Sequence, residues 1–124
     1  GHKGVEAFSG VDVVDEEGEW EYKATIANSI NGTYNGISGQ DTWEEQERYL
    51  IEEKLGNYSN HYIARYDGGK LAEVRKLTGD DVLMILLPKL KKDWERKIQG
   101  KHKDPRLSGS LTKKEIQQFG RRIV

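Results

Sequence analysis

Residues 10–25 read GVDVVDEEGEWEYKAT, and this stretch decides the fold class that the sequence predicts. Residues 10–14 are rich in valine, and residues 20–26 combine aromatic and β-branched side chains, so both segments are typical of strands. The polar residues 15–19 between them predict a tight turn, because Gly18 can adopt a positive φ. We therefore expect a β-hairpin near the start of the chain.

Three charged side chains of this hairpin point to a chemical function. Glu21 and Lys23 are two residues apart, so they lie on the same face of the second strand. Asp12, on the first strand, can approach Glu21 across the hairpin. Two carboxylates and an ammonium in one patch are costly unless a cation joins them, and Mg²⁺ accepts carboxylate, carbonyl and water ligands.

The spacing of Asp12, Glu21 and Lys23 resembles the signature of the PD-(D/E)XK nuclease superfamily, which includes many restriction endonucleases. Val11 stands where a proline usually precedes the aspartate. The resemblance implies a restriction-endonuclease-like core and a Mg²⁺ ion, with Mn²⁺ as a substitute. Asp12, Glu21 and the carbonyl of Tyr22 would hold this ion, and Lys23 would orient the attacking water.

This resemblance leads us to expect a Mg²⁺-dependent endodeoxyribonuclease of restriction type that acts on double-stranded DNA. Glu6 is a candidate for the additional acid that many members of the superfamily carry. A homodimer is expected, because cutting both strands requires two active sites. Two alternatives stay open, namely a catalytically silent DNA-binding module of the same fold and a structural protein in which the three charges form an ordinary cross-strand salt bridge.

Length and composition predict one domain over residues 1–124, of class α/β (α+β), with a small mixed sheet of about four strands flanked by helices. Residues 1–2 resemble a tag remnant, and residues 100–124 form a basic C-terminal extension. The chain has no cysteine, no apolar run of membrane-spanning length and no signal-peptide pattern. We expect no membrane partner and a cytoplasmic location, in a prokaryote, phage or virus.

The small net charge of −1 conceals a strong polarity along the chain. Residues 1–57 carry 13 acidic and 4 basic side chains, whereas residues 89–124 carry 4 acidic and 12 basic side chains. An acidic half that holds a metal ion and a basic half that holds phosphates would suit a nuclease. Alternatively, the two halves neutralise each other within a chain or across a dimer.

Two polar segments are candidates for DNA contact. Residues 27–41 are rich in Asn, Gly, Ser and Thr and are predicted to be a loop. Side-chain amides and hydroxyls read base edges or bind phosphate oxygens, so we assign DNA contacts to Asn28, Asn31, Thr33, Tyr34, Asn35, Ser38 and Gln40. Residues 100–111 are predicted to be a basic loop in which Lys101, Lys103 and Arg106 bind DNA.

Helices are expected at residues 42–55, 78–99 and 112–120. Thr42, Thr78 and Thr112 are suitable N-caps, and Pro88 should kink or divide the middle helix. The five glutamates of residues 42–55 are expected to face away from DNA. A second hairpin is expected at residues 60–77, with its turn at residues 67–69 and with His61 as an ordinary strand histidine.

Overall fold

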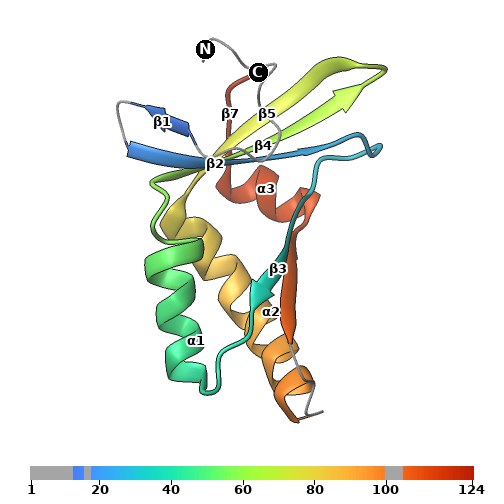
Figure 1. Ribbon diagram of the computed structural model, residues 1–124. Coiled ribbons are helices and arrows are strands. Elements are labelled where there is room, and N and C mark those ends of the chain that lie inside the picture. The colour runs from blue at the N-terminus through green and yellow to red at the C-terminus, as the bar shows by residue number, and fades with distance from the viewer. Residues whose placement is uncertain (1–12, 16–17, 100–104) are drawn as a thin grey trace.

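The two hairpins supply most of a mixed sheet, and helices cover one face of it (Figure 1). The computed structural model describes residues 13–15, 18–99 and 105–124. The elements in chain order are β1 (Val13–Asp15), β2 (Gly18–Thr25), β3 (Gly32–Ser38), α1 (Trp43–Tyr49) continued by a π-helical segment (Leu50–Lys54), β4 (Asn60–Asp67), β5 (Lys70–Thr78), α2 (Gly79–Gln99), β6 (Arg106–Leu111), α3 (Lys113–Phe119) and β7 (Arg121–Arg122).

The main sheet has the strand order β1-β2-β4-β5-β7. Strands β1 and β2 pair antiparallel, as do β4 with β5 and β5 with β7, whereas β2 and β4 run parallel. The predicted small mixed sheet of about four strands flanked by helices is confirmed, with the two-residue β7 added at one edge. Gly68 and Gly69 have positive φ values of 56° and 80°, which explains the tight turn between β4 and β5.

The prediction of loops at residues 27–41 and 100–111 is wrong for Gly32–Ser38 and Arg106–Leu111, whereas residues 27–31 and 39–41 belong to no helix or strand. Gly32–Ser38 and Arg106–Leu111 form an antiparallel two-stranded sheet that lies beside α2 (Figure 1). The register shifts between Tyr34 and Ile37, where Gly36 adopts a φ of 67°. This bulge interrupts the two-residue alternation by which a strand is recognised in a sequence.

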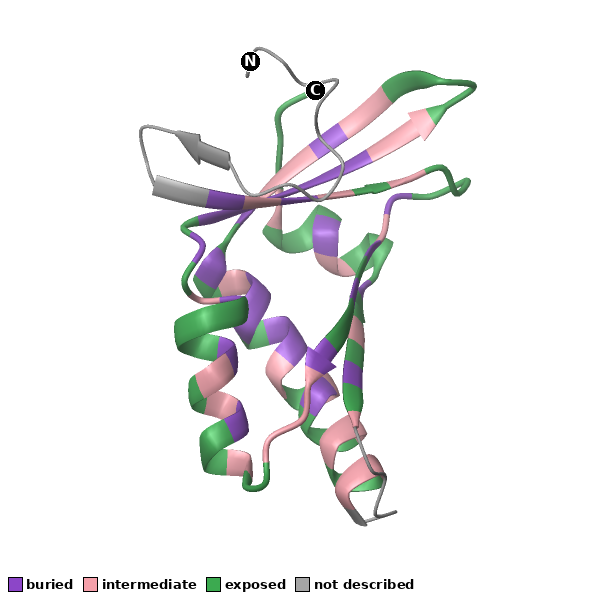
Figure 2. Cartoon of the chain, viewed as in Figure 1, coloured by how far each residue is buried: buried purple, intermediate pink, exposed green. Residues whose placement is uncertain are grey.

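Hydrophobic side chains are buried on both faces of the main sheet. Ile63 and Leu77 belong to the larger core, which α2 completes with side chains such as Leu86 and Leu90. Trp20, Tyr22, Tyr62, Ala64 and Val74 form a second cluster on the opposite face. Figure 2 shows buried positions along β2 and β4 and along the sides of α1 and α2 that face the rest of the chain.

The predicted helices are confirmed, apart from the division expected at Pro88. α2 continues from Gly79 to Gln99 with Pro88 inside it. Pro88 and Met84, one turn earlier, are both exposed, so water can hydrate the carbonyl that loses its N–H partner. Within the described ranges, no helix combines the length and the apolar character needed to span a membrane.

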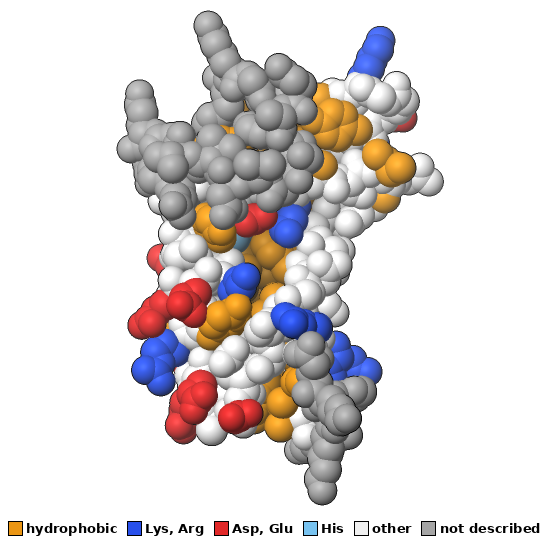
Figure 3. Space-filling model, viewed as in Figure 1, with side chains coloured by type: hydrophobic (Ala, Val, Ile, Leu, Met, Phe, Trp, Pro, Cys, Tyr) orange, Lys and Arg blue, Asp and Glu red, His pale blue; other side chains and the backbone are white. Residues whose placement is uncertain are grey.

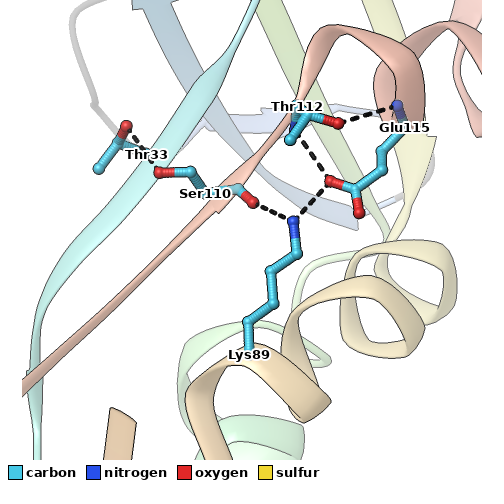
Figure 4. Close-up of polar contacts among 5 residues, drawn as sticks. All are labelled: Thr33, Lys89, Ser110, Thr112 and Glu115. Atoms are coloured by element: carbon cyan, nitrogen blue, oxygen red, sulfur yellow. Dashed lines mark hydrogen bonds and ion pairs between the residues drawn. The ribbon is translucent and has the colours of Figure 1, made fainter. Parts of the chain in front are cut away.

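A polar cluster joins α2, β3, β6 and α3 (Figure 4). The Lys89 ammonium donates to the Ser110 carbonyl at 2.7 Å and to the Glu115 carboxylate at 2.6 Å, and the Thr33 and Ser110 hydroxyls lie 3.2 Å apart. Thr112 is the N-cap of α3, as predicted, and it forms a capping box with Glu115. Burial alone would raise the pKa of Glu115, but its bonds with Lys89 and Thr112 hold this pKa below its ordinary value.

Candidate functional site

Glu21 and Lys23 extend from β2 toward the same side of the main sheet, as their spacing predicts. The parallel register places Glu21 beside His61 and Lys23 beside Ile63 on β4, so these four side chains share the face that carries the larger core. The Lys23 ammonium lies 3.6 Å from the Glu21 carboxylate. Their side chains are 29% and 13% exposed, so this ion pair is accessible but partly shielded from water.

The pair opens into a small pocket between β2, β3 and the segment that follows α1. This site pocket has a volume of about 140 Å³ and is lined by Glu21, Lys23, Tyr34, Asn35, Gly36, Ile37, Lys54 and Tyr58. Figure 3 shows acidic and basic side chains beside hydrophobic ones in a hollow of the surface in this region. The chain therefore gathers charge of both signs around a partly apolar depression.

Tyr34 lines the site pocket, and the buried His61 supports it by a hydrogen bond. The hydroxyl of Tyr34 and Nδ1 of His61 are 2.8 Å apart, and Nε2 of His61 lies 3.0 Å from the carbonyl oxygen of Leu55. A carbonyl only accepts hydrogen bonds, so neutral His61 carries its proton on Nε2, and Tyr34 donates to Nδ1. Both ring nitrogens of this fully buried histidine thus have partners.

The surroundings of these two rings keep both of them uncharged near neutral pH. Burial lowers the pKa of His61 to about 4. The hydrogen bond to Leu55 raises this pKa, and the nearby Lys23 ammonium lowers it. Burial, with a contribution from the Glu21 carboxylate, raises the pKa of Tyr34 far above its ordinary value. The Lys23 ammonium lies 5.0 Å from the centre of the Tyr34 ring, a distance typical of a cation–π contact.

Tyr22, the third residue of the predicted site on β2, points to the opposite face of the sheet. Its side chain is buried in the second cluster, and its hydroxyl lies 3.1 Å from that of Tyr66. Only its backbone carbonyl was expected to bind a metal ion, and that role stays a prediction. The expected ligands Asp12 and Glu6 lie outside the described residues, as do the expected DNA contacts Lys101 and Lys103.

Several residues assigned to DNA contact make bonds within the chain. Ser38 accepts a hydrogen bond from Arg106 at 2.8 Å through its hydroxyl. Its carbonyl accepts one from the buried Gln46 at 3.2 Å. The carbonyl of Gln40 accepts a hydrogen bond from the Trp94 indole at 2.8 Å. These contacts hold the end of β3 against α1, α2 and β6, so these groups already have structural partners.

The remaining predicted contacts are more open to solvent. Asn28 and Asn35 are exposed, and Asn31 donates to the carbonyl of Ser29 at 3.2 Å. Thr33 is also exposed and pairs with Ser110 in the polar cluster. Of the asparagines, only Asn35 lines the site pocket, and it does so next to Tyr34.

An acidic surface lies close to the site pocket. Glu45, Glu52 and Glu53, together with Arg48, line a second hollow of about 320 Å³ along α1 and its π-helical continuation. Figure 3 shows acidic side chains on the same face of the molecule as the site pocket. The expectation that these glutamates face away from DNA stays a prediction.

Sequence reasoning missed Lys54, Tyr58 and the supporting role of His61. Lys54 and Tyr58 reach the site pocket because α1 lies in the crossover between the parallel strands β2 and β4. No spacing pattern in the sequence links these positions to Glu21 and Lys23. Buried His61 was predicted as an ordinary strand residue, and no local signal marks its bonds to Tyr34 and Leu55.

Among the described residues, no group of three His, Cys, Asp or Glu side chains is placed to hold a metal ion. This observation does not test the predicted metal site, because Asp12 and Glu6 lie outside that part of the chain. No protein-family model matches this chain, and no curated protein shows significant similarity to it.

Proposed function

We propose that the protein is a Mg²⁺-dependent endodeoxyribonuclease that hydrolyses phosphodiester bonds of double-stranded DNA at the site pocket. The observation that carries this proposal is the placement of Glu21 and Lys23, which face one pocket from the same strand at 3.6 Å. A carboxylate and an ammonium that share a partly shielded pocket can act on the same phosphate group.

Each residue has a defined role in this reaction. Glu21 supplies one oxygen ligand, and the reaction needs a second from Asp12. Among the described residues the hairpin pairs Val13 with Trp20, so a register that continued by one residue would bring Asp12 to Glu21. A bound Mg²⁺ or Mn²⁺ ion would lower the pKa of a water molecule and polarise the phosphate.

Lys23 contributes through its charge and its hydrogen-bond donors. Its ammonium can orient the attacking water and neutralise the charge that develops on the phosphate oxygens. It pairs with Glu21 and rests over Tyr34, so it is held at the pocket rather than extended into solvent. Two copies of the chain would be required to cut both strands of a duplex, and for this reason the proposal includes a homodimer.

Cleavage of mixed-sequence plasmid DNA tests this function. The wild type with Mg²⁺ should give discrete fragments, and EDTA should abolish them. Lys23→Ala should lower the rate by at least about 100-fold, the usual cost of removing one group that stabilises transition-state charge. The matched control is Lys70→Ala, which removes an exposed lysine at the start of β5.

Two results would contradict the proposal. Plasmid that stays intact with Mg²⁺ and Mn²⁺, at protein concentrations where a gel shift shows binding, would favour the catalytically silent DNA-binding module. Equal cleavage by wild type and Lys23→Ala would show that any nuclease activity arises elsewhere. A purely structural role for the Glu21–Lys23 pair predicts neither cleavage nor a change in melting temperature with divalent ions.

A further inference from the structure

We propose that the site pocket binds a single phosphate-type oxyanion and that Lys54 is its second cationic ligand, beside Lys23. Lys54 ends the π-helical segment and lines the pocket together with Tyr58. This inference deepens the proposed function by naming the group that enters the pocket and a residue that binds it. It rests on that function only in identifying the oxyanion as a phosphodiester.

The size of the pocket limits what it can bind. A volume of about 140 Å³ holds roughly four or five water molecules at about 30 Å³ each. Pockets that enclose drug-sized ligands are about 300–1,000 Å³. The site pocket therefore suits a phosphate group with its oxygens, whereas a nucleoside attached to that group would remain outside.

The charges of the pocket favour an anion. Lys23 and Lys54 face one carboxylate, that of Glu21, and Lys23 is already paired with it. Lys54 forms no ion pair with any other described residue, and its ammonium lies 5.8 Å from the centre of the Tyr49 ring. Among its described lining residues the pocket thus has two ammonium groups and one carboxylate, and the exposed Asn35 adds side-chain amide donors at its rim.

The base of the pocket is formed before any ligand arrives. His61 fixes the Tyr34 hydroxyl at 2.8 Å, and the ring of Tyr58 packs edge-on against His61 with centres 5.8 Å apart. One buried histidine therefore supports both tyrosines that line the pocket. A preformed site loses little conformational freedom on binding, which favours even a small ligand.

The acidic side chains of α1 oppose this attraction. Glu52 and Glu53 precede Lys54 directly and line the neighbouring hollow. Salt screens exposed charges over about 10 Å at 0.1 M ionic strength, so their effect weakens as salt is added. For these reasons we expect millimolar affinity for free phosphate, with the closest contacts made by the two lysines.

Titration of the full chain with inorganic phosphate tests the inference without metal or DNA. The readout is the backbone amide NMR signals of Asn35, Gly36 and Ile37, recorded with EDTA and at constant ionic strength. Lys54→Ala should weaken binding about tenfold, as expected for the loss of a charged hydrogen-bond partner. Lys54→Arg should retain most of the affinity, because it keeps the charge.

Lys91→Ala is the matched control. Lys91 is also exposed, and its ammonium also lies 5.8 Å from an aromatic ring, that of Trp43 on α1. This variant should bind phosphate like the wild type. Saturable shifts at the three amides that weaken only in Lys54→Ala would support the inference. Shifts that do not saturate, or that weaken equally in both alanine variants, would overturn it.

The same titration separates this inference from the proposed function. If the wild type binds phosphate through Lys54 but leaves plasmid DNA intact, the oxyanion site stands and the proposed nuclease activity is refuted. If Lys54→Ala cuts DNA as efficiently as the wild type, and the wild-type amides do not respond to phosphate, the nuclease activity stands and Lys54 is excluded as a ligand.

Discussion

Because buried His61 stays neutral, the fold should lose stability between pH 7.5 and pH 5. The pKa of His61 is about 4 in the folded chain, against an ordinary value of 6.5. Below pH 6.5 the unfolded chain binds a proton that the folded chain does not, so stability falls as the pH decreases. The loss ends near pH 4, below which both states are protonated.

The structure sets the size of this effect. At about 1.4 kcal/mol per pH unit, the full difference corresponds to about 3 kcal/mol, of which about 2 kcal/mol should be lost by pH 5. Burial alone would raise the pKa values of Asp93 and Glu115. Bonds from Arg96, Ser108 and Lys97 lower the pKa of Asp93, and bonds from Lys89 and Thr112 lower that of Glu115. These two carboxylates therefore lose their stabilising contribution at more acidic pH, as they become protonated in the folded chain.

Urea unfolding of the wild type and of His61→Gln at pH 7.5, 6.5, 5.5 and 5 measures this loss. Glutamine does not titrate and can still donate and accept hydrogen bonds, so the variant should lack about 2 kcal/mol of the pH dependence. Direct ¹⁵N NMR titration of wild-type His61 should give a pKa near 4 and a proton on Nε2. A His61 pKa near 6.5, or an equal pH dependence in both proteins, would refute the reasoning.

Two further substitutions test the packing around the site. Lys89→Met removes the bonds to Ser110 and Glu115 and should lower the free energy of unfolding, measured by urea unfolding, by about 1–2 kcal/mol. Its control Lys92→Met, at an exposed position of the same helix, should change this free energy by less than about 0.5 kcal/mol. Gly79→Ala should lower the melting temperature, because its Cβ would lie 2.3 Å from the carbonyl oxygen of Tyr58. Since alanine normally stabilises a helix relative to glycine, a raised melting temperature would show that this contact relaxes freely.

Local signals in the sequence were sufficient to predict the two hairpins and the ends of the helices, although the first turn is shorter than the predicted residues 15–19 because Asp15 pairs with Gly18. Gly68 and Gly69 marked the turn between β4 and β5, and Thr112 with Glu115 marked the start of α3. Each of these features depends on residues only a few positions apart, whose chemistry the sequence displays directly. The same holds for the common face of Glu21 and Lys23, which follows from the two-residue period of a strand.

The elements that depend on distant partners could not be predicted in this way. β3 is rich in residues typical of loops, and it is held by β6, with Thr33 pairing with Ser110 near the other end of the chain. The parallel register that brings His61 beside Glu21 also depends on strands separated by a helix. For these reasons the sequence predicted the charged pair of the site but not the tyrosines, the histidine and Lys54 around it.

The separation of paired strands along the chain has a consequence for synthesis on the ribosome. Trp20 pairs with Asn60, 40 residues later, and Gly32 pairs with Leu111, 79 residues later. At about 5–20 residues per second, the partner of β2 follows after roughly 2–8 s and that of β3 after roughly 4–16 s. The β4–β5 hairpin, by contrast, can close as soon as it emerges. The nascent chain therefore carries the aromatic strand β2 without its parallel neighbour for seconds, and in that interval it is most exposed to aggregation and to chaperone binding.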